Sequence, residues 1–186
     1  MHRRKLLEGL RAYRVDNLEE LQLVDRFDSF INENVDCFDR SNLEGHVTGS
    51  AWLVSPDGKQ ALLTHHKKLG RWLQLGGHSD GESDTLLVSK REAEEESGLR
   101  VEPLDETIFD IDIHEIPARG DEPAHFHFDV RFLFRALDLR FVVSSESHDL
   151  RWVDLLKIEK FSNEWSVIRM RDKCLKKLGR GCFKRI

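Results

Sequence analysis

The chain has 186 residues, 39% hydrophobic and 34% charged, which is enough for one globular domain with a buried core. Its formal net charge of −5 argues against a protein that coats nucleic acid, although a local basic pocket or a divalent cation can still bind an anionic substrate. Cys37, Cys174 and Cys182 have no metal-ligand spacing, and no apolar run reaches the roughly 18 to 20 residues of a membrane span. We therefore expect a soluble, cytoplasmic protein with structural cysteines and no membrane partner.

Residues 1–43 are expected to form a helical N-terminal extension. From Asn17 to Asn34, apolar residues recur at three- and four-residue intervals, which places them on one helical face: Leu18, Leu21, Val24, Phe27 and Ile31. Asn17 and Glu20 resemble a capping box at the start of this helix. A shorter helix is expected before it.

The pattern changes near residue 44, where the main domain, residues 44–160, is expected to begin. Residues 46–55 and 60–65 predict the two strands of a hairpin around the Pro56-Asp57-Gly58-Lys59 turn. A glycine-rich loop, residues 76–81, then precedes a helix predicted over residues 84–97. Ser83 or Asp84 would cap this helix at its start, and Gly98 would end it.

Two later segments alternate apolar and polar residues, as strands with one buried face do. They cover residues 109–113 and 126–134, and the link at residues 117–123 predicts that they pair as a hairpin. A further strand is expected at residues 150–153.

The last segment, residues 161–186, is assigned to a C-terminal helix and a basic tail on the same domain. A helix over residues 164–178 would turn Trp165, Ile168 and Leu175 inward. The basic tail can be explained as a solvated helix end or as a contact for RNA or an acidic partner, and the first explanation is favoured.

Three glutamates of the helix at residues 84–97 carry the clearest chemical signal. Glu92, Glu95 and Glu96 are spaced i, i+3 and i+4, so their carboxylates share one helical face, whereas Glu94 falls off it. Like charges so close together are unfavourable unless a cation lies among them, and carboxylate oxygens suit Mg²⁺ or Mn²⁺. Most acidic helices are only solvated faces, but the preceding glycine loop and the nearby Arg91 favour a metal site here.

The same stretch resembles the Nudix hydrolases, whose signature is Gly, five residues, Glu, seven residues, then Arg-Glu-apolar-any-Glu-Glu-any-Gly-apolar. This chain has Gly77, then Ser83, then Arg91-Glu92-Ala93-Glu94-Glu95-Glu96-Ser97-Gly98-Leu99. Every fixed position matches except the first glutamate, which is Ser83. Because serine is neutral, we expect weaker metal affinity or fewer ions, but not a loss of activity.

A bacterial subgroup within that family shows further likeness. Its elements are a helical N-terminal lead, Gly-His-x-Thr, Gly-Gly-His and His-x-His-x-Asp. They match Gly45-His46-Val47-Thr48, Gly76-Gly77-His78 and His125-Phe126-His127-Phe128-Asp129. The resemblance therefore extends over nearly the whole chain.

The resemblance implies an α/β/α sandwich with a mixed sheet and a site on the glutamate helix. Glu92, Glu95 and Glu96 would hold Mg²⁺ or Mn²⁺, the Gly77 carbonyl would add a ligand, and Arg91 would orient the carboxylates. The cation would polarise a phosphoryl oxygen and activate a water for attack on phosphorus. A carboxylate would take the proton; Glu146 in a late loop is one candidate base, and Glu95 or Glu96 are others.

Histidines form a second candidate group. His125, His127, Asp129 and Arg131 alternate with apolar residues, so they share one face of their strand. That face would be either a solvated surface of the sheet or, together with His46 and His78, a site for substrate phosphates or a second metal. The basic residues Lys67, Lys68 and Arg71 would clamp a substrate phosphate or lie in a solvated turn.

The sequence therefore predicts a hydrolase that cleaves a phosphoanhydride bond in a nucleoside diphosphate linked to another moiety. One alternative is a non-catalytic Nudix-fold module that binds a nucleotide and regulates. A less favoured one is an enzyme like type I isopentenyl diphosphate isomerase, because Gly76 stands where the resemblance would require that enzyme's acid/base cysteine. A small nucleotide-type substrate is expected, capped or triphosphorylated RNA stays open, and the sequence is compatible with a homodimer.

Overall fold

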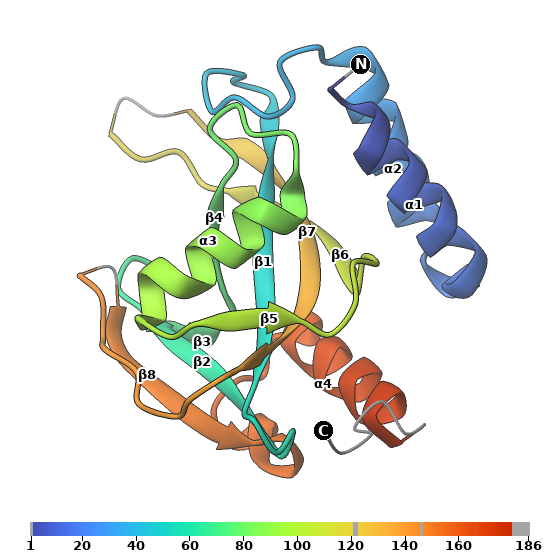
Figure 1. Cartoon of the computed structure of the whole chain (residues 1–186). Helices are drawn as coiled ribbons and strands as arrows, with labels where there is room; N and C mark the ends of the chain where they lie inside the picture. The colour runs from blue at the N-terminus through green and yellow to red at the C-terminus, as the bar shows by residue number, and fades with distance from the viewer. Residues whose placement is uncertain (1, 121–122, 146, 180–186) are drawn as a thin grey trace. The chain divides into compact units, whose positions relative to one another are not determined.

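The computed structural model describes residues 2–120, 123–145 and 147–179 and has the expected α/β fold, a mixed sheet with helices (Figure 1). The helices are α1 (Arg4–Asp16), α2 (Leu21–Glu33), α3 (Thr85–Ser97) and α4 (Trp165–Lys177), with short 3₁₀ turns η1 (Leu18–Glu20) and η2 (Leu155–Lys160). The strands are β1 (Gly45–Val54), β2 (Gln60–His66), β3 (Arg71–Leu73), β4 (Leu75–His78), β5 (Val101–Pro103), β6 (Asp110–Ile116), β7 (His125–Ala136) and β8 (Ser147–Asp154). None of the described helices combines the length and the hydropathy that crossing a membrane requires.

Strand pairing confirms both hairpins expected from the sequence. β1 pairs antiparallel with β2, and β6 pairs antiparallel with β7 in a register that sets Ile113 opposite Phe128. The order along the sheet is β3-β2-β1-β7-β5; β4 pairs with β1, β6 with β7 and β8 with β2. The division of the chain into an extension, a main domain and a C-terminal segment stays a prediction.

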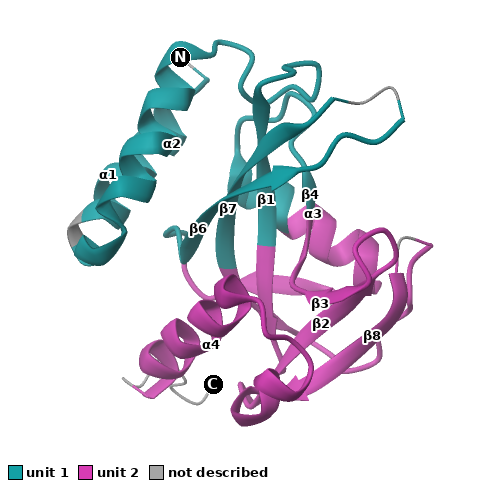
Figure 2. Cartoon of the chain, turned by 180° about the vertical axis from the view of Figure 1, so that it is seen from behind, with its two compact units in different colours: residues 1–50, 77–89, 106–132 teal, residues 51–76, 90–105, 133–186 magenta. Residues whose placement is uncertain are grey.

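Contacts divide the chain into two compact units, which are described separately (Figure 2). Unit 1 contains residues 1–50, 77–89 and 106–132, and unit 2 contains residues 51–76, 90–105 and 133–186. Helices α1 and α2 belong to unit 1, and β2, β3, β5, β8 and α4 belong to unit 2.

Helix α2 supplies much of the apolar core of unit 1. Its side chains Val24, Phe27 and Ile31 are buried at helical spacing, as the sequence predicts. The ring of Phe30 stacks on that of Phe128 in β7, with 3.8 Å between the ring centroids. Helix α1 lies alongside α2 (Figures 1 and 2).

The capping box expected at Asn17 and Glu20 is absent from this part of the described chain. Asn17 precedes η1 without a capping hydrogen bond from its side chain, which donates instead to the Tyr13 carbonyl. Glu20 accepts a hydrogen bond from the Tyr13 hydroxyl at 2.5 Å. Both polar side chains therefore form hydrogen bonds with Tyr13 in α1 instead of capping the next helix. A sequence pattern that starts at Asn17 does not include this residue.

The close approach of β1 to the start of α3 depends on Gly49. A Cβ atom at this position would lie 2.9 Å from Ser89 Oγ and from Val88 Cγ1, and 3.0 Å from the Thr85 carbonyl oxygen. At its other end α3 stops as expected at Gly98, whose φ of 68° suits glycine and whose N–H donates to the Glu94 carbonyl.

The buried face of α4 differs from the expected one. Val167, Met170 and Cys174 are buried, whereas Trp165, expected to face inward, is 73% exposed. Trp165 is the first residue of the helix, and both faces fit the helical period. The position of the helix on unit 2, which its sequence does not specify, decides between them.

Candidate functional site

The second half of α3 contains the three candidate metal ligands of unit 2. Glu92 and Glu96 lie one helical turn apart with Glu95 beside them; Glu96 is buried at 6% exposure, Glu92 is half-buried and Glu95 is exposed. An oxygen of Glu96 accepts a hydrogen bond of 2.7 Å from the Gly76 backbone N–H. The bond joins the helix to Gly76, the first residue of the glycine loop and its only residue within unit 2.

Arg91 contacts the carboxylate next to it. Its guanidinium donates to Glu92 at 2.8 Å, so it orients the first glutamate of the face. Glu94, the off-face glutamate, accepts a hydrogen bond from the Val101 N–H at 3.3 Å. Glu94 therefore points toward Val101, away from the helical face that Glu92, Glu95 and Glu96 share.

Within the described residues, the side chains that bring metal-ligand atoms close together are three histidines and not the three glutamates. The ligand atoms of His46, His125 and His127 all lie within 4.8 Å of one another. The three glutamates do not form such a group in the described part of the chain. Like charges repel, so ionised carboxylates favour separation, and a divalent cation among them would offset that repulsion.

Five histidine rings gather in unit 1. The ring of His46 lies 5.0 Å from those of His78 and His125, and 4.8 Å from that of His127, measured between centroids. His114, which the sequence reasoning missed, lies opposite His127 in the β6–β7 hairpin, at 5.4 Å. The hairpin was predicted, but its register, which sets His114 opposite His127, was not.

Burial keeps two of these rings neutral. Desolvation, helped by His78 and His125, lowers the pKa of His46 to about 4. Desolvation and the neighbouring histidines lower the pKa of His127 to about 2. Both are neutral imidazoles at pH 7, which can coordinate a metal and carry no charge that would attract phosphate.

The polar stripe of β7 is not a solvated face. Asp129 and Arg131 are 2% and 1% exposed. The Arg131 guanidinium lies 2.7 Å from a carboxylate oxygen of Asp129, 3.0 Å from Asp110 and 3.2 Å from Asp112. Burial alone would lower the pKa of Arg131, but these carboxylates outweigh it and raise the pKa above its ordinary value.

The other oxygen of Asp129 accepts hydrogen bonds from Thr48 at 3.0 Å and Ser50 at 2.7 Å. This aspartate, expected beside the histidines as a ligand, therefore takes part in a buried polar network across β1 and β7.

The basic residues expected to clamp phosphate lie in unit 2. Lys67 donates to the Ser145 carbonyl at 2.6 Å, and Arg71 forms a 3.0 Å ion pair with Glu164. Lys68 is exposed. The candidate base Glu146 and the end of the basic tail, Arg180, Lys184 and Arg185, lie outside the described residues.

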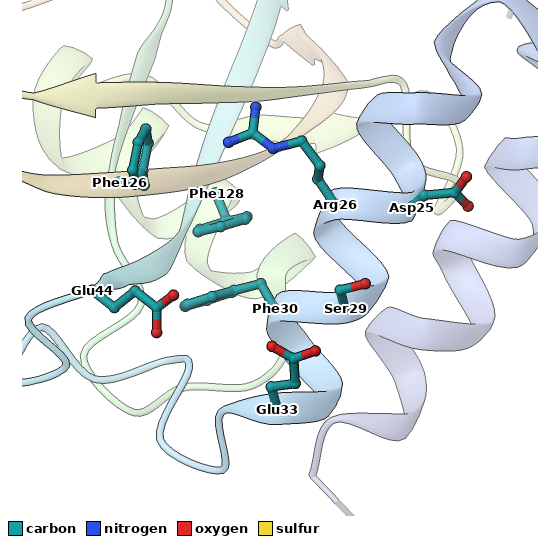
Figure 3. Close-up of a pocket in the computed structure, with 8 residues that line it drawn as sticks. All are labelled: Asp25, Arg26, Ser29, Phe30, Glu33, Glu44, Phe126 and Phe128. Carbon is teal, nitrogen blue, oxygen red and sulfur yellow. The ribbon is translucent and has the colours of Figure 1, made fainter.

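A pocket in unit 1 is lined by side chains from α2 and from the start of β7 (Figure 3). Asp25, Glu33 and Glu44 line it with a single cation, Arg26, so its charge disfavours phosphates. It contains none of the expected site residues.

Comparison with solved structures identifies the fold. The chain superposes on a Nudix-family hydrolase from Clostridium perfringens with a TM-score of 0.55 and 24% identity, over 72% of this chain and 97% of the other. An ADP-ribose pyrophosphatase from Streptococcus suis superposes with a TM-score of 0.51 and 19% sequence identity, over 71% of this chain and 90% of the other. An Ap4A hydrolase from C. elegans superposes with a TM-score of 0.51 and 15% sequence identity, over 72% of this chain and 98% of the other. The chain has the fold of these hydrolases.

No family model and no curated protein sequence matches the chain.

Proposed function

We propose that this chain, which has the fold of the Nudix hydrolases, is a metal-dependent pyrophosphohydrolase. Its substrate would be a nucleoside diphosphate linked to another moiety. One observation carries the proposal: in that fold, α3 presents Glu92, Glu95 and Glu96 at i, i+3 and i+4, with buried Glu96 bonded to the glycine loop at Gly76. Two of the similar structures are named for such substrates, ADP-ribose and Ap4A, which supports the substrate class.

The donor set fits Mg²⁺ or Mn²⁺. Carboxylate oxygens are the ligands these hard cations prefer, and Glu92, Glu95 and Glu96 would hold the ion. When bound, the ion supplies Lewis-acid polarisation of a phosphoryl oxygen and lowers the pKa of a coordinated water.

The residues of this chain would divide the remaining work. Arg91 holds Glu92 in place through their 2.8 Å hydrogen bond, and the Gly76 N–H fixes the direction of Glu96. Glu95 is exposed and has neither of these bonds, so its carboxylate oxygen that is not on the ion would accept the proton of the attacking water. Lys67, Lys68 and Arg71 would bind substrate phosphates, which requires Lys67 and Arg71 to exchange their present partners.

A substrate panel tests the function. ADP-ribose, nucleotide sugars, dinucleoside polyphosphates and nucleoside triphosphates are incubated with the wild type and with Mg²⁺ or Mn²⁺, and released phosphate groups are measured. Glu95→Gln and Glu96→Gln should each lower kcat by roughly 100-fold or more, because they remove a base or a ligand carboxylate.

Glu94→Gln is the matched control. It removes the same charge from the same helix but off the glutamate face, so its rate should stay within a few-fold of the wild type. Circular dichroism spectra check that all three variants fold. Binding of a nucleotide without turnover of any panel member would instead support the non-catalytic module, the alternative that Ser83 keeps open.

A further inference from the structure

The histidine cluster of unit 1 has the composition of a transition-metal site. His46, on β1, and His125 and His127, on β7, bring ligand atoms within 4.8 Å of one another. Imidazole nitrogen suits Zn²⁺, whereas Mg²⁺ prefers oxygen, so this group differs in chemistry from the glutamates of α3. Three histidines with an open fourth position is a ligand number that zinc accepts.

The ring nitrogens are ready to coordinate. His125 Nδ1 lies 2.9 Å from the Pro123 carbonyl oxygen, which can only accept a hydrogen bond. Nδ1 is therefore the donor of this bond, and in the neutral tautomer that the bond selects Nε2 is the atom that can bind a metal, the arrangement that orients metal-ligating histidines. His125 is 5% exposed, so its Nε2 is directed into the protein interior.

The rings of His46 and His127 each have a buried nitrogen available to a ligand. His46 is 1% exposed, and its ring nitrogens and Nε2 of His127 are buried without a well-aligned hydrogen-bond partner in the described residues. The Asn42 backbone carbonyl lies near enough to the His46 ring to act on its pKa, so at most one of the two His46 nitrogens has a polar neighbour. Buried polar groups in this state destabilise a fold unless something satisfies them. A shared cation would satisfy one nitrogen of each ring at once.

The loop that carries His78 is fixed beside this group. Arg40 holds Asp80 through two hydrogen bonds of 2.6 Å, and the Gly81 N–H donates to the Phe38 carbonyl at 3.0 Å. His78 thus keeps its ring 5.0 Å from that of His46 and 5.1 Å from that of His127. It would border an ion held by His46, His125 and His127.

We propose that unit 1 binds a zinc ion through His46, His125 and His127, independently of the carboxylate face on α3. The inference does not rest on the proposed hydrolase function, because its readout is metal binding. A core packed from satisfied histidines is the alternative that the experiment must exclude.

Zinc binding is measured on the full chain after treatment with a chelator. Equilibrium dialysis against Zn²⁺ in excess Mg²⁺, which would occupy carboxylate ligands, should give one tightly bound zinc. His46→Ala and His127→Ala should each weaken binding by roughly 100-fold or more. His148→Ala removes an exposed histidine and should leave binding unchanged, and so should Glu92→Gln combined with Glu96→Gln.

A measurement on the wild type alone covers the case in which a histidine variant fails to fold. X-ray absorption of the zinc-loaded protein should show nitrogen neighbours at about 2.0 Å with the multiple-scattering signature of imidazole. No tight zinc in the wild type, a shell of oxygen neighbours, or undiminished binding by folded His46→Ala and His127→Ala would each overturn the proposal. Loss of hydrolysis in the glutamate variants with zinc retained would leave it intact.

Discussion

At the scale of single residues, burial sets the chemistry of the cysteines as it does that of the histidines. Cys37 and Cys174 are both fully buried, each in its own unit. Desolvation raises the pKa of each thiol to about 11. The thiolate is the reactive form, so both residues should be inert near neutral pH, in agreement with the structural role expected from their spacing.

A thiol-reactivity assay tests this. In a Cys182→Ser variant, which leaves only the two described cysteines, reaction with a disulfide reagent at pH 8 should be roughly 100-fold slower than for an unperturbed thiol. The rate should keep rising as pH increases toward 11, because the thiolate fraction grows until pH passes the pKa. The same variant in urea provides the fully reactive reference. Rapid modification of both thiols in the native state would contradict the burial described.

At the scale of elements, β7 shows that one strand can carry two buried faces. Its apolar residues Phe128, Val130 and Phe132 are buried, and so are Asp129 and Arg131 between them. The alternation predicted the strand and its two faces but assigned the polar one to solvent or to ligands. The neighbouring aspartates of β6 and hydroxyls of β1 account for the difference, because they satisfy the charges that burial would otherwise leave unpaired.

Replacement of Arg131 by methionine tests that network. Three carboxylates would lose their shared cation in a buried setting, so Arg131→Met should destabilise the protein by about 3–5 kcal/mol in urea unfolding. Arg135→Met, four residues along β7, is the matched control. Its ion pair with Glu102 spans 3.9 Å, and the Glu102 side chain is mostly exposed while Arg135 is half-buried, so the substitution should cost clearly less, about 1 kcal/mol. An equal loss of unfolding free energy in the two variants would show that the buried network stabilises the protein no more than the ion pair of Arg135.

At the scale of the whole molecule, the N-terminal helices belong to the core of unit 1. Removal of α1 and α2 would uncover Phe128 and withdraw the buried side chains of both helices, Leu6, Leu10 and Tyr13 of α1 and Val24, Phe27, Phe30 and Ile31 of α2. Each large apolar side chain contributes about 1.5–3 kcal/mol on burial. Their sum is comparable with the total stability of about 5–15 kcal/mol of a typical native protein.

A fragment that begins at residue 44 should therefore fail to unfold cooperatively. Thermal unfolding followed by circular dichroism compares it with the full chain, and with a chain shortened only by its C-terminal residues 180–186. A cooperative transition of the fragment at the temperature of the full chain would show that residues 1–43 are a dispensable extension.

The sequence by itself determined the features that depend on local periodicity. The i, i+3, i+4 glutamates, the two hairpins and the glycine that ends α3 follow from spacing along one segment, because backbone geometry converts spacing into direction. The resemblance carried by residues 77–99 also pointed to the fold that the structural comparison found.

Only the tertiary structure decided what covers each face. Spacing did not reveal that His114 joins the histidines, that Arg131 is enclosed by three aspartates, that the Gly76 N–H holds Glu96, or that α4 buries Met170 rather than Trp165. Each of these facts depends on which distant segment packs against a face, and the free energy of that packing is a property of the assembled chain.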